Sequence, residues 1–99
     1  MTQDKYTKLA RGKDCQVRIE GVCNFNPETT VLAHVRIIGV SGLGMKSPSI
    51  LGAWACAACH QACDTGQYNG VHYEREFCEL ALLRGMARTQ AALLKMGAL

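Results

Sequence analysis

The sequence lacks a long hydrophobic run. Its first fifteen residues, MTQDKYTKLARGKDC, are polar and basic. We therefore expect neither a secretory signal peptide nor a membrane anchor, and no membrane partner. The expected location is the cytoplasm, where the reducing environment disfavours a disulfide framework.

Proline and aromatic residues are also scarce, yet the composition is that of a folded chain. Aromatic residues make up 6% of the 99 residues, hydrophobic residues 48% and charged residues 19%. A chain of this length encloses one modest core, so we expect a single domain spanning residues 1–99. Because a small core offsets little of the ordering entropy, a bound metal ion would add useful stability.

Acidic residues are rare near the N-terminus, although the net charge of the chain is only +3. Only Asp4 and Asp14 fall among the first eighteen residues. The basic residues of the same stretch are Lys5, Lys8, Arg11, Lys13 and Arg18. We interpret residues 1–13 as a basic arm that either binds a polyanion or is a solvated tail.

Cysteine, in contrast, is abundant: the chain has six, and three of them lie in the segment WACAACHQACD, residues 54–64. In a reducing compartment such a cluster indicates metal binding or redox chemistry. The letters CAACH match the attachment signature of c-type haem, but that attachment normally takes place outside the cytosol. A thioredoxin-like dithiol would need a βαβ frame, and no second strand is visible after a crossover helix.

Zinc is the third interpretation of the cluster and the one we favour. Cys56 and Cys59 have the two-residue gap of a zinc knuckle, which lets both thiolates bind one ion. Cys15 and Cys23, upstream, are candidates for the other two ligands, although their spacing is wider. Cys63 is a rival fourth ligand, because it lies four residues after Cys59 on the same expected helix.

The pattern of apolar residues and turn residues predicts a mixed α and β fold. The expected elements are a strand at 16–19, a strand at 30–38, a glycine-rich loop at 39–49, a strand at 50–56 and a helix at 56–66. A long helix is predicted at 72–96, because apolar residues recur there every three or four positions. Gly97 is placed to end it. Cys78, on an apolar stripe of this helix, is expected to be buried rather than to bind metal.

Two likenesses emerge from the order of cysteines and histidines. The order Cys15, Cys23, His34, Cys56, Cys59, His60 resembles HNH endonucleases that add a zinc site to the ββα-metal motif. More closely, the segments KYTKLARGKDCQVRIEGVCNFNPETTVLAHVR, GVSGLGMKSPSILGAWACAACH and RGMARTQAALL resemble the YbcO-like nucleases of bacteriophages and prophages. This closer likeness covers nearly the whole chain.

The resemblance implies a small zinc-stapled ββα-metal domain of the α+β class, with its core at residues 15–66 and a long C-terminal helix. His34 corresponds to the general base that takes a proton from the attacking water, and His60 to a ligand of a catalytic divalent metal such as Mg²⁺. The structural zinc ligands correspond to Cys15, Cys23, Cys56 and Cys59. By pattern alone, a lone histidine in an apolar strand is more often a hydrogen-bonded core residue.

The sequence departs from the HNH pattern at the catalytic metal. An acidic ligand usually precedes the base, whereas this chain has Ala33 there, and the asparagine expected before the knuckle is missing from SILGAWAC. Asp64 or His72 are candidates to complete the metal shell. Arg36 and Lys46 are candidates to bind phosphate from the strand and the glycine loop.

The predicted function is therefore metal-dependent endonuclease cleavage of DNA, with RNA as an alternative substrate. A first rival is a zinc-stabilised nucleic-acid-binding module without catalysis, which Ala33 favours. A second rival is an interaction domain that forms a homodimer through its C-terminal helix.

Overall fold

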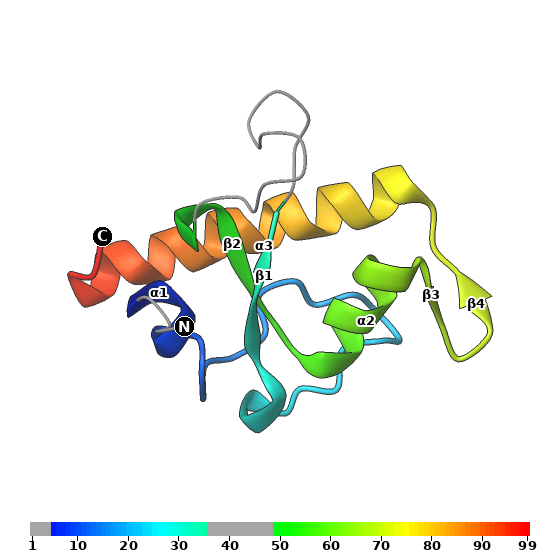
Figure 1. The fold of residues 1–99 in the computed structure, drawn as a ribbon, viewed down its shortest axis with the longest axis horizontal. Coiled ribbons are helices and arrows are strands. Elements are labelled where there is room, and N and C mark those ends of the chain that lie inside the picture. Colours follow the sequence, from blue (N-terminus) through cyan, green and yellow to red (C-terminus); the bar gives the residue numbers. More distant parts are fainter. Residues whose placement is uncertain (1–4, 36–48) are drawn as a thin grey trace.

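A hairpin of two strands crosses one long helix at the centre of the fold (Figure 1). The computed structural model describes residues 5–35 and 49–99. Its elements are α1 (Lys5–Leu9), β1 (Val31–His34), β2 (Gly52–Ala55), α2 (Ala57–Thr65), β3 (Gln67–Tyr68), β4 (Val71–His72) and α3 (Arg75–Met96), with 3-10 turns at Pro27–Thr29 and Ser49–Leu51. The expected α+β class with a long C-terminal helix is confirmed.

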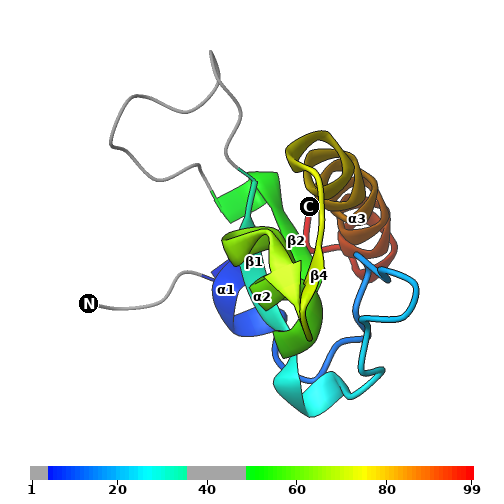
Figure 2. The ribbon, with the colours of Figure 1, turned by 90° about the vertical axis from the view of Figure 1, so that its right-hand side faces the viewer.

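The central hairpin pairs β1 with β2 in antiparallel register. Leu32 lies opposite Trp54, and His34 lies opposite Gly52. All four residues of β2 are buried, because α3 packs across this strand (Figure 2). A Cβ on Gly52 would lie 2.6 Å from Leu32 Cδ1, so only glycine allows the two strands to approach with Leu32 in place.

Helix α3 is held against β2 by its narrow buried face. The buried residues of α3 are Cys78, Gly85, Thr89 and Leu93. Gly97 ends the helix in a left-handed conformation with φ 73°, as predicted. The helix begins at Arg75 rather than at residue 72, because Val71 and His72 pair with Tyr68 and Gln67 in the small β3–β4 hairpin.

Helix α2 agrees with the sequence-based prediction at both ends. The Cys56 side chain caps its first turn, and Gly66, with φ 77°, ends it. The β3–β4 hairpin that follows turns through Asn69 and Gly70, which both have positive φ. Asn-Gly is a residue pair preferred in two-residue type I′ hairpin turns.

Two expectations for the N-terminal part were wrong. Residues 16–19 do not form a strand, because Arg18 adopts a positive φ of 53° and turns the chain. The alternation of buried Val17 and Ile19 that suggested a strand instead directs both side chains into the core. The segment expected to be an arm includes helix α1, and the following residue, Ala10, is fully buried.

Two apolar clusters form the core. One contains Trp54, which is 3% exposed, together with Leu32, Leu93 and Ala10. The other surrounds the buried cysteines near the start of α2. Among the described residues, no helix has the length and hydropathy needed to span a membrane.

Candidate functional site

Four cysteines from two distant segments meet beside the first turn of α2. Cys15 and Cys23 come from the segment between α1 and the turn at Pro27–Thr29, which we call the N-terminal loop. Cys56 precedes α2, and Cys59 lies in the first turn of α2. Their four sulfur atoms all lie within 4.8 Å of one another. Three of the side chains are buried, and Cys23 is half-buried.

The backbone around the cluster directs amide groups at the sulfur atoms. The amide of Cys59 donates to Cys56 Sγ at 3.4 Å, and the amide of Arg18 donates to Cys15 Sγ at 3.5 Å. Such N–H donors stabilise negative charge on sulfur.

The spacing of the four sulfur atoms is compatible with one bound metal ion. Cys23 Sγ and Cys56 Sγ lie 3.9 Å apart, and a tetrahedron with zinc–sulfur bonds of about 2.3 Å has sulfur atoms about 3.8 Å apart. All six cysteines of the chain are free thiols. The cluster could therefore hold a metal ion, and it consists of the four cysteines that the resemblance implied as ligands.

The hydrogen bond between Cys15 and Cys59 shifts the pKa values of the two thiols in opposite directions. A hydrogen bond from the Cys59 thiol lowers the pKa of Cys15 to about 4. The same contact with Cys15 raises the pKa of Cys59, and burial raises the pKa of Cys23 to about 11. One thiolate is thus stabilised by neighbours that keep their protons. A bound dication would take the place of those protons.

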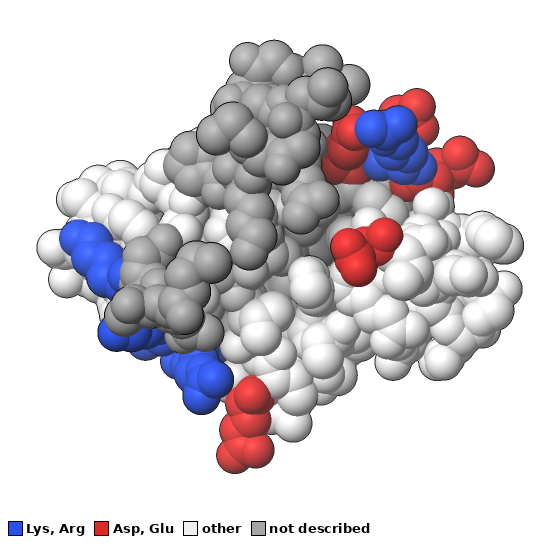
Figure 3. Space-filling model, viewed as in Figure 1, with Lys and Arg blue, Asp and Glu red and all other residues white. Residues whose placement is uncertain are grey.

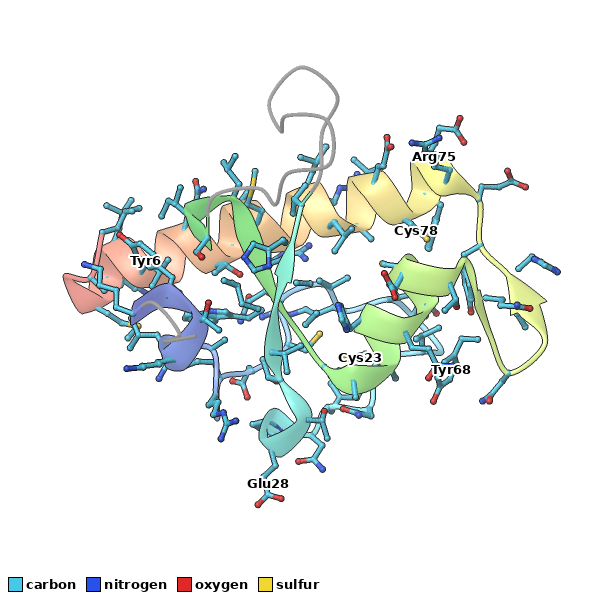
Figure 4. The ribbon with its side chains drawn as sticks, viewed as in Figure 1. Tyr6, Cys23, Glu28, Tyr68, Arg75 and Cys78 are labelled. Carbon is cyan, nitrogen blue, oxygen red and sulfur yellow. The ribbon has the colours of Figure 1, made fainter. Side chains whose placement is uncertain are left out.

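The two remaining cysteines form a separate pair between α2 and α3. Cys63, the rival fourth ligand, is not part of the group of four sulfur atoms that lie within 4.8 Å of one another. Burial, followed by the neighbouring Cys78 thiol, raises the pKa of Cys63 to about 12. Cys78 is buried, as predicted, and its thiol donates to the carbonyl of Ala62 at 3.8 Å. Figure 4 shows Cys78 on α3 pointing toward α2.

A cavity of about 650 Å³ opens between β1, α2 and α3. His34, the last residue of β1, and His60, in the first turns of α2, both line it. Asp64 also lines the cavity, one helical turn after His60. Two histidines predicted from separate segments of the sequence therefore share one cavity.

The first turns of α3 form the opposite wall of this cavity. Arg75 and Glu79 line it and form a salt bridge, with Arg75 Nε 3.5 Å from Glu79 Oε1. Among the described residues that line the cavity, Arg75 is the one lysine or arginine. Sequence reasoning missed this pair; the i, i+4 spacing of opposite charges at the start of a helix was the available signal.

Other expected residues lie elsewhere. His72 is exposed on β4 and does not line the cavity, whereas Ala33 lines it without offering a ligand atom. Arg36 and Lys46 lie outside the described residues. Within the described chain, the four cysteines are the one group of three or more potential ligands whose atoms come within 4.8 Å of one another. A second, fully formed metal shell is thus not found there.

Comparison with known proteins agrees with the likeness seen in the sequence. A family model described as "Putative nuclease YbcO" matches residues 4–98. Proteins named "Putative nuclease YbcO" from Escherichia coli (strain K12) and "Putative nuclease ybcO" from Enterobacteria phage 82 are each 48% identical over 91 residues, which is 91% of either chain.

A solved structure has the same fold. It is titled "Structure of a putative bacteriophage protein from Escherichia coli str. K-12 substr. MG1655" and superposes with a TM-score of 0.74 at 43% identity. The match covers 93% of this chain and 99% of the other. Matches of this extent to a family model, two relatives and a structure leave one conclusion: the chain belongs to the YbcO family of putative nucleases.

Proposed function

We propose that this protein is a metal-dependent endonuclease that hydrolyses phosphodiester bonds of DNA in the cavity between β1, α2 and α3. The observation that carries the proposal is that His34 and His60, from different elements, line the same cavity beside a four-cysteine cluster. The name of the family supports a nuclease activity. In the proposal, the cluster supplies structure and the cavity supplies the chemistry.

The zinc ion would join the N-terminal loop to α2. Cys15 and Cys23 would bind it from the loop, and Cys56 and Cys59 from the start of α2. A zinc ion with four thiolate ligands has no open position for a substrate, so its role would be structural. It would fix α2, and with it His60, relative to the N-terminal loop.

His34 is proposed as the general base. It ends β1, and its side chain is half-buried, so the paired strand restrains the ring while the cavity gives water access to it. The oxygen of the water bonds to phosphorus as its proton passes to a ring nitrogen of His34. The bond from phosphorus to the leaving sugar oxygen breaks, and that oxygen takes up a proton from solvent water, while the proton on His34 returns to solvent.

His60 and Asp64 are proposed to bind a divalent cation such as Mg²⁺. They are exposed, one turn apart on α2, and both line the cavity. When bound, the cation would offset the charge that develops on the phosphate. Mg²⁺ commonly keeps several waters and relies on one or two carboxylates with substrate phosphate, so an incomplete protein shell is compatible with it.

We infer an HNH-type mechanism from the order of these elements. The strand with His34 is followed by its antiparallel partner and then by the helix with His60, which is the order of a ββα-metal motif. Ala33 stands where an acidic ligand is usual, and Asp64 or Glu79 would supply the carboxylate instead.

Two other functions have some support. The absence of a carboxylate at Ala33 favours a nucleic-acid-binding module without catalysis. Exposed apolar side chains on α3, among them Leu80 at 47% and Leu94 at 62% exposure, favour an interaction domain that pairs through this helix.

Nicking of supercoiled plasmid in Mg²⁺ or Mn²⁺ tests the proposal. Wild-type protein should convert supercoiled DNA to the open circle, and His34→Ala should slow this conversion by about 10²–10⁴-fold. His72→Ala is the matched control, because His72 is exposed and lies outside the cavity. Salt-sensitive DNA binding without nicking would support the binding module. Concentration-dependent dimers without DNA binding would support the interaction domain.

A further inference from the structure

On the face shown in Figure 3, most basic side chains and most acidic side chains lie at different ends of the molecule. Basic side chains gather at the α1 end, and acidic side chains, with Arg75 among them, gather where α3 begins. The basic group, which we call the α1 cations, is Lys5, Lys8 and Arg11, all exposed. The acidic group is Asp64, Glu74, Glu76 and Glu79, also exposed.

The α1 cations are held in place by tertiary packing. Tyr6, Leu9 and Ala10 pack against a cluster that contains Leu32 and Leu93. A helix as short as α1 is not stable alone, so this packing is what positions it. Fixed cations lose less conformational entropy on binding an anion than cations on a flexible tail.

The α1 cations have no acidic partner in the described chain. The salt bridge found there joins Arg75 to Glu79 at the opposite end. Lys5 instead extends along Tyr6, with its Nζ 5.0 Å from the centre of the ring. Within residues 5–35 and 49–99, therefore, no ion pair neutralises the positive charge of α1.

One strand separates α1 from the cavity. Leu32 on β1 packs with the residues of α1 and also lines the cavity. Figure 1 shows α1 and α2 on opposite sides of β1, and Figure 2 shows that α1 and β1 lie on the same side of α3. A linear polyanion crossing β1 near His34 would thus meet the cavity on one side and the α1 cations on the other.

We propose that the α1 cations form a docking surface for the sugar–phosphate backbone of duplex DNA, separate from the cavity in which the scissile phosphate would lie. This inference rests on the proposed function, because it takes DNA as the substrate. Phosphate contacts of this kind fix position without reading sequence. Glu74 and Glu76 of the acidic group do not line the cavity, and they would repel a duplex that extended past it, so the bound duplex is expected to run from the cavity toward α1.

The test compares two variants with the same change of net charge in different places. Lys5→Gln/Lys8→Gln and Arg84→Glu each lower the net charge by two. Arg84 is exposed and does not line the cavity. Arg84 lies one turn before Arg88 on α3, and Arg88 Nη1 donates to the Gln16 carbonyl at 2.7 Å. The side of α3 that carries both arginines therefore faces the N-terminal loop.

Affinity for a 20-base-pair duplex should be measured by fluorescence anisotropy across a KCl series, without Mg²⁺ or Mn²⁺ so that no cleavage intervenes. The double variant should bind about tenfold more weakly, and the slope of log affinity against log salt should fall by about 1.8, because two phosphate contacts are lost. Arg84→Glu should change the slope by less than half of that amount.

Equal losses in the two variants, or an unchanged slope in the double variant, would overturn the docking surface. Lysine-dependent binding to phosphatidylglycerol vesicles without binding to DNA would overturn it as well. Because binding is measured without cleavage, wild-type protein that binds through α1 but never nicks plasmid would support the docking surface and reject only the nuclease. Circular dichroism of the double variant serves as the check on folding.

Discussion

Cys23 Sγ lies 3.9 Å from Cys56 Sγ, although the two residues are 33 positions apart in the chain. Such a contact brings the N-terminal loop to the start of α2. We predict about one tightly bound zinc ion per chain, measured by inductively coupled plasma mass spectrometry. Cys56→Ser should lose the metal and most of the folded structure, because the binding energy of a structural zinc is also folding energy.

The matched control for this prediction is Cys63→Ser. Cys63 lies outside the four-cysteine group, so its variant should keep a full complement of zinc. Normal folding of Cys56→Ser without metal would show that metal binding by the cluster does not stabilise the fold.

A second prediction concerns the hydrogen bond that joins β2 to α3. The Trp54 amide donates to Thr89 Oγ1 at 3.0 Å, and Thr89 is 1% exposed. Thr89→Val keeps the shape but leaves the amide without an acceptor, so it should lower the free energy of unfolding by about 1–3 kcal/mol. Thr89→Ser keeps the hydroxyl and should cost less. Denaturant unfolding measures both, and equal losses would mean that the hydroxyl is unimportant.

A third prediction concerns the close approach of α3 to the N-terminal loop. A Cβ on Gly85 would lie 2.9 Å from Val17 Cγ2 and 3.2 Å from its Cα and amide nitrogen. Gly85→Ala should therefore destabilise the protein by about 1–3 kcal/mol through overpacking. On helix propensity alone the change would stabilise by about 1 kcal/mol. A rise in Tm for Gly85→Ala would contradict this packing.

A fourth prediction follows from the buried thiol between α2 and α3. Burial and the Cys78 thiol raise the pKa of Cys63 to about 12, so the folded state keeps a proton that the unfolded chain releases near pH 8.5. The stability due to this thiol is therefore fully present below about pH 8.5 and is lost as the pH rises toward 12. The difference in unfolding free energy between wild type and Cys63→Ala should shrink across this range. A constant difference would argue against a buried, protonated thiol.

Local sequence signals were sufficient for α2 and most of α3. Gly66 ends one helix and Gly97 ends the other, as expected, because a glycine cap acts over a single turn. The start of α3 was misplaced, since pairing of β3 with β4 takes up residues that the helical pattern would also allow.

Long-range features were harder to predict. The apolar alternation at Val17 and Ile19 suggested a strand, but the positive φ of Arg18 curls this segment around the cysteines. The order of cysteines and histidines led to the correct four-cysteine group, whereas the Arg75–Glu79 wall of the cavity depends on how α3 packs, which one sequence does not reveal.

Chemical rescue is the measurement that tests the central claim most directly. If His34 is the general base, His34→Ala should slow plasmid nicking by about 10²–10⁴-fold, and added imidazole should restore a substantial part of the rate. His60→Ala should not be rescued in the same way if it binds a cation. Nicking by His34→Ala at the wild-type rate, with no response to imidazole, would contradict the account.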